Sequence, residues 1–161
     1  MLNKIRYADQ AASDAHLKIE PVQKLIKWFT EEGPLTGAPE VNNLAPTIDL
    51  RRDITKAEPG MIFLFAHMGM KPGKVDEAIP VFEELIKGVY DLEPEFWGCT
   101  ACADKEKNLI RVVDMFKNES FYDNEHQKSA PILNFHKKIG DYASGDFGLV
   151  KLKVVQGYLG R

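Results

Sequence analysis

Five side chains that could perform acid–base chemistry or stack on a ring stand in the C-terminal part of the chain. They are His67, Trp97, Tyr122, His126 and His136. Histidine is the side chain whose charge changes most readily near neutral pH, and it is the commonest general base. In an apolar pocket, such a base could remove a proton from a phenol or an enol while neighbouring donors hold the resulting oxyanion.

His67 is predicted to be that base. It lies in the apolar run 61–70, where strand alternation places Phe65 and His67 on the same face. A histidine in so apolar a strand suits proton abstraction, and Phe65 beside it is predicted to contact the substrate. The alternative is a structural histidine whose ring makes one hydrogen bond in a core or an interface.

Tyr122 and His126 are four residues apart, so they share one face of a helix. We predict that they hold a substrate oxygen together, with His126 stabilising negative charge. The alternative is a hydrogen bond at the helix start that orients this segment. Trp97, in a predicted strand, could stack on a planar aromatic substrate or pack in the core. His136, which two lysines follow, is expected at the surface.

Cys99 and Cys102 form a Cys-x-x-Cys pair. A redox pair of this spacing belongs at a helix N-terminus, where the helix dipole stabilises the thiolate. Here the pair falls inside a predicted strand, in which positions three apart face opposite sides. No second pair exists for zinc, and no glycine-rich phosphate loop is present. We expect no metal and no cofactor, although haem ligation by one of the four histidines stays open.

The segment after residue 60 predicts the elements that must position these side chains. They are, in order, a strand at 61–70, a helix at 75–92, strands at 96–103 and 109–116, a helix at 119–142 and a strand at 149–158. This β-α-β-β-α-β order predicts an α+β, ferredoxin-like unit, in which right-handed crossovers place both helices on one face of an antiparallel sheet. The bare face needs a cover, so we expect a homodimer.

The N-terminal part predicts a helical extension of this unit. Residues 8–32 form an amphipathic pattern that should kink or break at Pro21, and residues 47–52 could be a short strand. We therefore predict a partial repeat at 1–58 and a complete unit at 59–161.

A short internal match supports the repeat. His16, four residues and Pro21 in the first helical segment correspond to His126, four residues and Pro131 in the last. On this interpretation, the N-terminal part echoes only the final helix and strand of the unit.

Composition and charge exclude several classes of protein. The 161 residues carry 21 Lys and Arg against 24 Asp and Glu, a formal charge of −3, which gives no basic patch for nucleic acid. No apolar run approaches the roughly 20 residues that cross a bilayer, and the N-terminus lacks the apolar stretch of a signal peptide. Two cysteines are too few for the disulfide framework of a small secreted protein. We expect a cytoplasmic protein without a membrane or nucleic-acid partner.

The sequence over 61–161 resembles the antibiotic-biosynthesis monooxygenase family of dimeric α+β barrel proteins. The segments that carry the resemblance are Lys71-Pro72-Gly73-Lys74 between the first strand and helix, Glu93-Pro94 before the second strand, and Phe121-Tyr122-Asp123 with His126, Ser129 and Pro131. The remaining 1–58 look like the tail of a tandem copy. The family usually has Glu-Pro-Gly after the first helix, where this chain has Glu93-Pro94-Glu95.

The resemblance implies an enzyme of secondary metabolism that oxidises aromatic or polyketide-like molecules with O2, without metal or flavin. We therefore expect a cofactor-independent monooxygenase with a phenolic substrate. His67 is then the base and His126 stabilises charge, while Trp97, Tyr122 and Phe65 bind the ring. Because relatives of this fold differ in chemistry, two alternatives remain. One is a lyase, cyclase or decarboxylase in the same pocket, and the other is a non-catalytic ligand-binding or dimerisation module.

Overall fold

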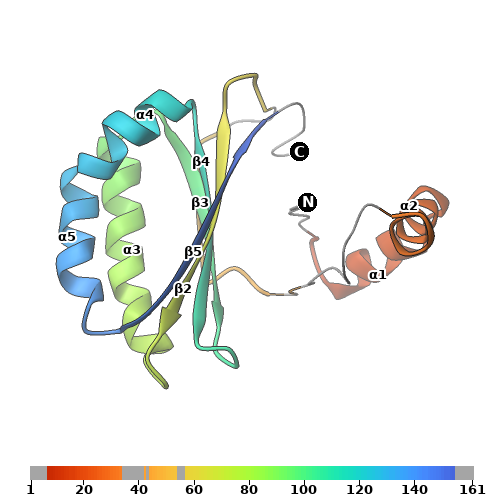
Figure 1. Cartoon of the computed structure of the whole chain (residues 1–161), viewed down its shortest axis with the longest axis horizontal. Coiled ribbons are helices and arrows are strands. Elements are labelled where there is room, and N and C mark those ends of the chain that lie inside the picture. Colours follow the sequence, from red (N-terminus) through yellow and green to blue (C-terminus); the bar gives the residue numbers. More distant parts are fainter. Residues whose placement is uncertain (1–6, 34–41, 43, 54–56, 155–161) are drawn as a thin grey trace. The chain divides into compact units, whose positions relative to one another are not determined.

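The computed structural model describes residues 7–33, 42, 44–53 and 57–154 (Figure 1). The chain divides into two compact units, 1–43 and 44–161. The strand predicted at 47–52 falls in the second unit, whereas the expected boundary lies at 58/59. That residues 1–58 are a partial repeat stays a prediction, as does the homodimer.

The second unit is built on a five-stranded antiparallel sheet with strand order β1-β3-β4-β2-β5. The strands are β1 (Ile48–Arg51), β2 (Ile62–Met70), β3 (Phe96–Asp104), β4 (Leu109–Phe116) and β5 (Ala143–Lys153). The helices are α3 (Val75–Leu92), α4 (Glu119–Asn124), the 3₁₀ turn η1 (His126–Lys128) and α5 (Ala130–Ile139). The predicted β-α-β-β-α-β order and the ferredoxin-like class are confirmed, and β1 adds a fifth strand beside β3.

Helices α3 and α5 lie on one side of the sheet, as Figure 1 shows. The apolar stripe of α3 supplies buried side chains to the core, namely Val75, Ala78, Phe82, Ile86 and Val89. The Phe82 and Phe135 rings meet edge to face, with centroids 5.0 Å apart, and join the two helices. A Cβ atom on Gly88 would lie 3.3 Å from the Pro131 ring, so glycine lets α5 approach α3 closely.

The helix predicted at 119–142 is wrong as a single element, because the chain forms α4, η1 and α5 there instead. Asn118 starts α4, where its side chain accepts a 2.8 Å hydrogen bond from the Phe121 amide. Pro131 has no amide hydrogen and would clash inside a helix, so it stands in the first turn of α5 after the extended residue Ser129. This break moves His126 out of a regular helix.

The last strand begins earlier than predicted, at residue 143 rather than 149. Gly145, Asp146 and Gly148 have low strand propensity, which hides the start of β5 in the sequence. Pairing with β2 determines the conformation here, and Met68 faces Phe147 across the two strands. The end predicted at residue 158 lies outside the described residues.

The first unit contains α1 (Gln10–Lys18) and α2 (Glu20–Glu31), which meet at the extended residue Ile19. The break predicted at Pro21 is confirmed, and it has the same local geometry as the break before Pro131. The dihedral angles are φ −71° and ψ 142° at Ile19, against φ −68° and ψ 152° at Ser129. In both segments the amide of this residue donates to the carbonyl of the preceding histidine, His16 or His126.

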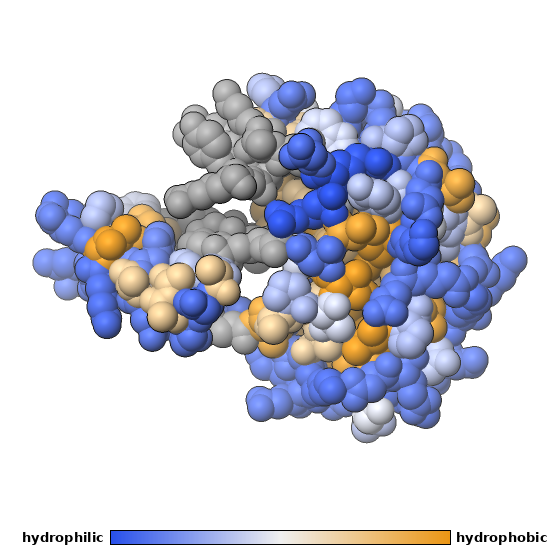
Figure 2. Space-filling model, turned by 180° about the vertical axis from the view of Figure 1, so that it is seen from behind, coloured by the Kyte–Doolittle hydropathy of each residue, from blue (hydrophilic) through white to orange (hydrophobic). Residues whose placement is uncertain are grey.

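Apolar side chains gather on the surface of the first unit, at the left of Figure 2. The large exposed ones are Leu17, Ile19, Leu25, Ile26 and Trp28. Among the described residues, no helix combines the length and the apolar character that a bilayer crossing requires.

Candidate active site

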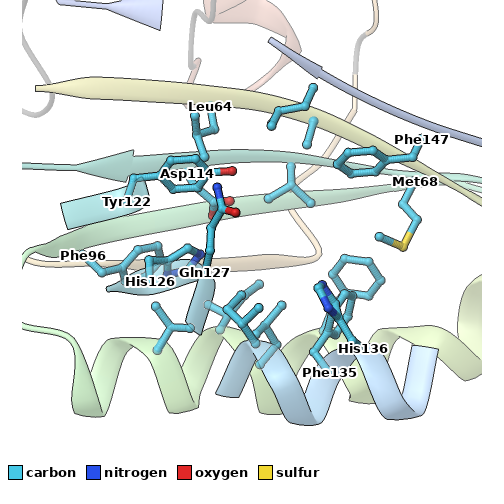
Figure 3. A pocket seen from close by; sticks show the side chains of 18 of the residues that line it. Leu64, Met68, Phe96, Asp114, Tyr122, His126, Gln127, Phe135, His136 and Phe147 are labelled. Atoms are coloured by element: carbon cyan, nitrogen blue, oxygen red, sulfur yellow. The ribbon is translucent and has the colours of Figure 1, made fainter. Parts of the chain in front are cut away.

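A cavity of about 400 Å³, called the main cavity here, lies between the helices and the sheet of the second unit. Its lining is mainly apolar and comes from strands β2, β3, β4 and β5 and from α3, α4, η1 and α5. Figure 3 shows that the polar side chains gather at one end of it: Asp114, Tyr122, His126 and Gln127. The opposite end carries Met68, Phe135, His136 and Phe147. This volume and asymmetry suit a small, largely apolar molecule with a polar group at one end.

His126 and Glu93 form a buried pair at the polar end. His126 Nδ1 lies 2.7 Å from Glu93 Oε2, and the two residues are only 8% and 6% exposed. A carboxylate oxygen accepts hydrogen bonds, so the hydrogen bond assigns the proton to Nδ1 and leaves Nε2 as the basic nitrogen. The carboxylate orients the ring and stabilises the imidazolium that forms when Nε2 takes a proton.

The turn that carries Glu93 is held by Arg52. Glu93 ends helix α3, where the exposed carbonyl oxygens carry partial negative charge. The Arg52 guanidinium donates to the carbonyls of Tyr90 at 2.6 Å, Glu93 at 3.1 Å and Phe96 at 2.8 Å. Arg52, which directly follows β1, thus holds the backbone of the turn from which the Glu93 side chain reaches His126.

Three aromatic rings surround the His126 imidazole. Its centroid lies 4.6 Å from that of Phe116, 5.6 Å from Tyr122 and 6.4 Å from Phe96. The Phe116 ring meets the imidazole at 64°, and the other two rings stack on it at 26° and 5°. These contacts restrict the imidazole to one orientation and keep bulk water from it, which strengthens electrostatic interactions at the site.

Tyr122 supplies a hydrogen-bond donor beside His126. Burial raises the pKa of the Tyr122 hydroxyl above its usual value, because the phenolate would lose hydration. The nearby charge of Lys151 opposes this rise, as does a hydrogen bond with the Gln127 side chain, whereas the Asp114 charge adds to it. Tyr122 is therefore a neutral phenol at physiological pH and can donate to a substrate oxygen.

His67 borders the main cavity, but its imidazole lies on the opposite face of β2 from the residues that form the cavity wall. In the β2–β5 register, Met68 pairs with Phe147 and His67 with Gly148. Directly paired residues share a face, and Met68 and Phe147 both line the cavity. A Cβ atom on Gly148 would collide with the His67 ring, so the imidazole packs over this glycine. The ring also lies near Asp146, with 3.5 Å between His67 Nε2 and Asp146 Oδ1.

Replacing Gly148 by alanine is expected to lower the free energy of unfolding by about 0.5–1.5 kcal/mol, because the new Cβ pushes the partly exposed His67 ring out of its rotamer. Urea denaturation of the variant measures this loss. The double variant His67→Ala/Gly148→Ala should recover most of it, since the colliding ring is gone. A Gly148→Ala variant as stable as the wild type would contradict the placement of His67.

The other predicted site residues lie in different places. Trp97 and Phe65 are half-buried and do not line the main cavity, while Tyr122 and His126 do. His136 is exposed, as expected, yet it lines the end of the cavity opposite His126. Cys99 is in the core and Cys102 is not, which agrees with opposite faces of a strand. In the described part of the chain, no group of three or more His, Cys, Asp or Glu could hold a metal ion.

Three residues at or next to the polar end were not identified from the sequence. Glu93 could be identified only as a helix stop, because its partner His126 is far away in the sequence. Asp114 could have been identified, because it is a charged residue in a largely apolar strand. Strand alternation places it on the same face as Phe116. Gln127 gave no signal, because its position depends on the break before Pro131.

Comparison with known proteins gives a match in structure and none in sequence. No model of a known protein family matches the chain, and no curated protein is significantly similar to it. A candidate monooxygenase from Fusobacterium nucleatum superposes with a TM-score of 0.75 at 14% identity, over 96% of this chain and 69% of that chain. One from Lactobacillus acidophilus has a TM-score of 0.70 at 12% identity, over 95% and 72%.

A shorter protein matches only part of the chain. A candidate antibiotic biosynthesis monooxygenase from Caulobacter crescentus has a TM-score of 0.54 at 20% identity, over 60% of this chain and 92% of that chain. At these identities the likeness concerns the fold. The chain therefore has the α+β, ferredoxin-like fold of antibiotic-biosynthesis-monooxygenase-type proteins.

Proposed function

We propose that the main cavity binds a planar phenolic or polyketide-like molecule and promotes its oxidation by O2 without a cofactor. The observation that carries the proposal is that His126, at the polar end of a mainly apolar cavity, is paired with the buried Glu93 behind it. Such a pair supplies a base in a place from which water is largely excluded, which is what the generation of an oxidisable carbanion or phenolate requires. The monooxygenase-type neighbours in structure agree with this chemistry.

The polar groups divide the work of the reaction. His126 Nε2 removes a proton from the substrate, and Glu93 stabilises the imidazolium through Nδ1. Tyr122 donates a hydrogen bond to the oxygen on which negative charge develops. The apolar walls from α3 and α5 hold the rings. The base is thus His126, because the His67 ring lies on the other face of the sheet.

The overall reaction is balanced without an external reductant. A substrate CH2 group activated by a phenol loses a proton to His126, and the resulting carbanion gives its electrons to O2. One oxygen atom forms the new C=O group and the other leaves as water, so R2CH2 and O2 become R2CO and H2O. The four electrons lost by carbon are those that O2 accepts.

A hydroxylated anthrone, which is a planar phenol with an oxidisable CH2 group, tests the proposal in an oxygen-electrode assay. We expect one O2 consumed per ketone formed, with no hydrogen peroxide accumulating. A lyase or cyclase in the same cavity would continue under anaerobic conditions, and a binding module would bind the anthrone without turnover. Either result would overturn the oxygenase assignment.

Replacing Tyr122 by phenylalanine should weaken binding of the phenolic probe 2-naphthol about 2- to 10-fold, because one hydrogen bond to the ligand oxygen is lost. Fluorescence titration measures the affinity. Since burial raises the pKa of Tyr122, its hydroxyl stays protonated below the usual phenol value of about 10. The ratio of the wild-type affinity to that of Tyr122→Phe should therefore be constant from about pH 6 to 8. Equal affinities of the two proteins would contradict the role of Tyr122.

A further inference from the structure

A second cavity, called the outer pocket here, lies beside the carboxyl end of helix α3 and has a volume of about 430 Å³. Glu93 and Ser129 are among the residues that line it, together with Glu95 and Glu125. His126 lines the main cavity and not the outer pocket, whereas Glu93 lines the outer pocket and not the main cavity. The 2.7 Å hydrogen bond between them therefore joins the two spaces.

Two residues that line the outer pocket each carry a buried oxygen atom without a hydrogen-bond partner among the described residues. Glu93 Oε1 and Ser129 Oγ are inaccessible and form no hydrogen bond with any described residue. Buried polar atoms are almost always satisfied, and a site this roomy with polar walls can hold water. Water in the outer pocket is the group that would satisfy both atoms. One carboxylate oxygen of Glu93 thus contacts His126, and the other is left for a water molecule that the outer pocket would supply.

We propose that Glu93 carries the proton that His126 takes from the substrate out to water in the outer pocket. The His126–Glu93 pair then forms a path by which the proton leaves on the side away from the bound substrate. This inference rests on the proposed function, because it needs His126 to act as the base.

The steps balance in protons and involve no electron transfer. A substrate C–H bond breaks and its proton joins His126 Nε2. The Nδ1–H bond then breaks as that proton moves to Glu93 Oε2, which restores a neutral imidazole. Rotation of the carboxylic group about its Cγ–Cδ bond presents the proton to the outer pocket. Water accepts it there, and Glu93 returns to a carboxylate. The peroxide that forms from the carbanion and O2 takes one proton back from water before it loses H2O, so the overall reaction releases no net proton.

The surroundings of the outer pocket favour departure of a positive charge. Glu125 is an exposed acidic residue at its wall, and a hydrogen bond from Lys117 lowers the pKa of Glu95, which is therefore a carboxylate near neutral pH. Negative groups around an opening attract cations, including the hydrated proton.

The exchange rate of the His126 Nδ1 proton with water tests the exit. It is measured by NMR on protein labelled with ¹⁵N in histidine, empty and saturated with 2-naphthol. Glu93→Gln keeps an oxygen that accepts from Nδ1–H but cannot carry a proton. Ser129→Val replaces the buried hydroxyl by two methyl groups, which leaves an apolar and narrower wall where water would bind. Ser129→Ala is its matched control, because it removes the same hydroxyl and adds no bulk.

We expect exchange at least tenfold slower in Glu93→Gln and in Ser129→Val than in the wild type, with Ser129→Ala within about twofold of the wild type. Circular dichroism confirms that each variant is folded. Equal rates in Glu93→Gln and the wild type, or in the two Ser129 variants, would overturn the exit. Failure of 2-naphthol to bind would count against the proposed function alone, since the comparison in the empty protein still decides the exit.

Discussion

Replacing His126 by asparagine is expected to reduce the rate of O2-dependent oxidation by about 10²- to 10⁴-fold, the usual contribution of a positioned general base. The asparagine amide can still donate to Glu93 Oε2 where Nδ1–H does now, so the buried carboxylate keeps a partner. What the variant lacks is the basic nitrogen Nε2. The loss should therefore appear in kcat, with a smaller change in the affinity for 2-naphthol.

His67→Asn is the matched control for this prediction. It makes the same substitution at the histidine whose ring packs over Gly148, on the other face of the sheet from His126. The rate should stay within about threefold of the wild type, since the catalytic base is untouched. The initial rates of O2 consumption of both variants are compared under the same conditions. Full loss in His67→Asn with retention in His126→Asn would restore His67 as the base. Wild-type rates in both variants would remove histidine from the mechanism.

The order of elements could be predicted from the sequence because each element has its own pattern. Helix α3 is amphipathic from Val75 to Leu92, and strands β3 and β4 are separated by a polar turn. The errors arise where a tertiary contact decides the conformation. Strand β5 contains Gly145 and Gly148, and only its pairing with β2 makes this segment extended.

The face of the sheet to which His67 belongs could not be predicted. Alternation correctly separates Phe65 and His67 from Leu64 and Met68, but both sets are apolar, so the pattern does not say which set meets the helices. The partnership of His126 with Glu93 was hidden for a different reason. Glu93 lies at the end of helix α3, whereas His126 lies in the 3₁₀ turn η1 that follows α4. Such distant pairs follow from packing rather than from local spacing in the sequence.

The same packing makes Phe116 the residue whose loss should cost the most stability. Its side chain is fully buried, at 0% exposure, and its ring touches three other aromatic groups besides His126, with centroid distances of 5.3 Å to Phe96 and Tyr122 and 6.4 Å to Phe121. Phe116→Ala leaves a cavity among rings that strands and helices hold apart, so they cannot collapse into it. We expect the free energy of unfolding to fall by about 3–5 kcal/mol.

Urea denaturation of Phe116→Ala, Phe116→Leu and Leu92→Ala measures this prediction. Leu92 is 67% exposed, so its truncation should change the stability by less than about 0.5 kcal/mol. Phe116→Leu keeps most of the volume and should cost about half as much as the alanine variant or less, yet it removes the ring edge that faces the His126 imidazole. A folded Phe116→Leu protein with reduced turnover would therefore show that the aromatic cluster orients the base as well as filling the core. A Phe116→Ala cost no larger than that of Leu92→Ala would mean that the cluster is not packed as the structure has it.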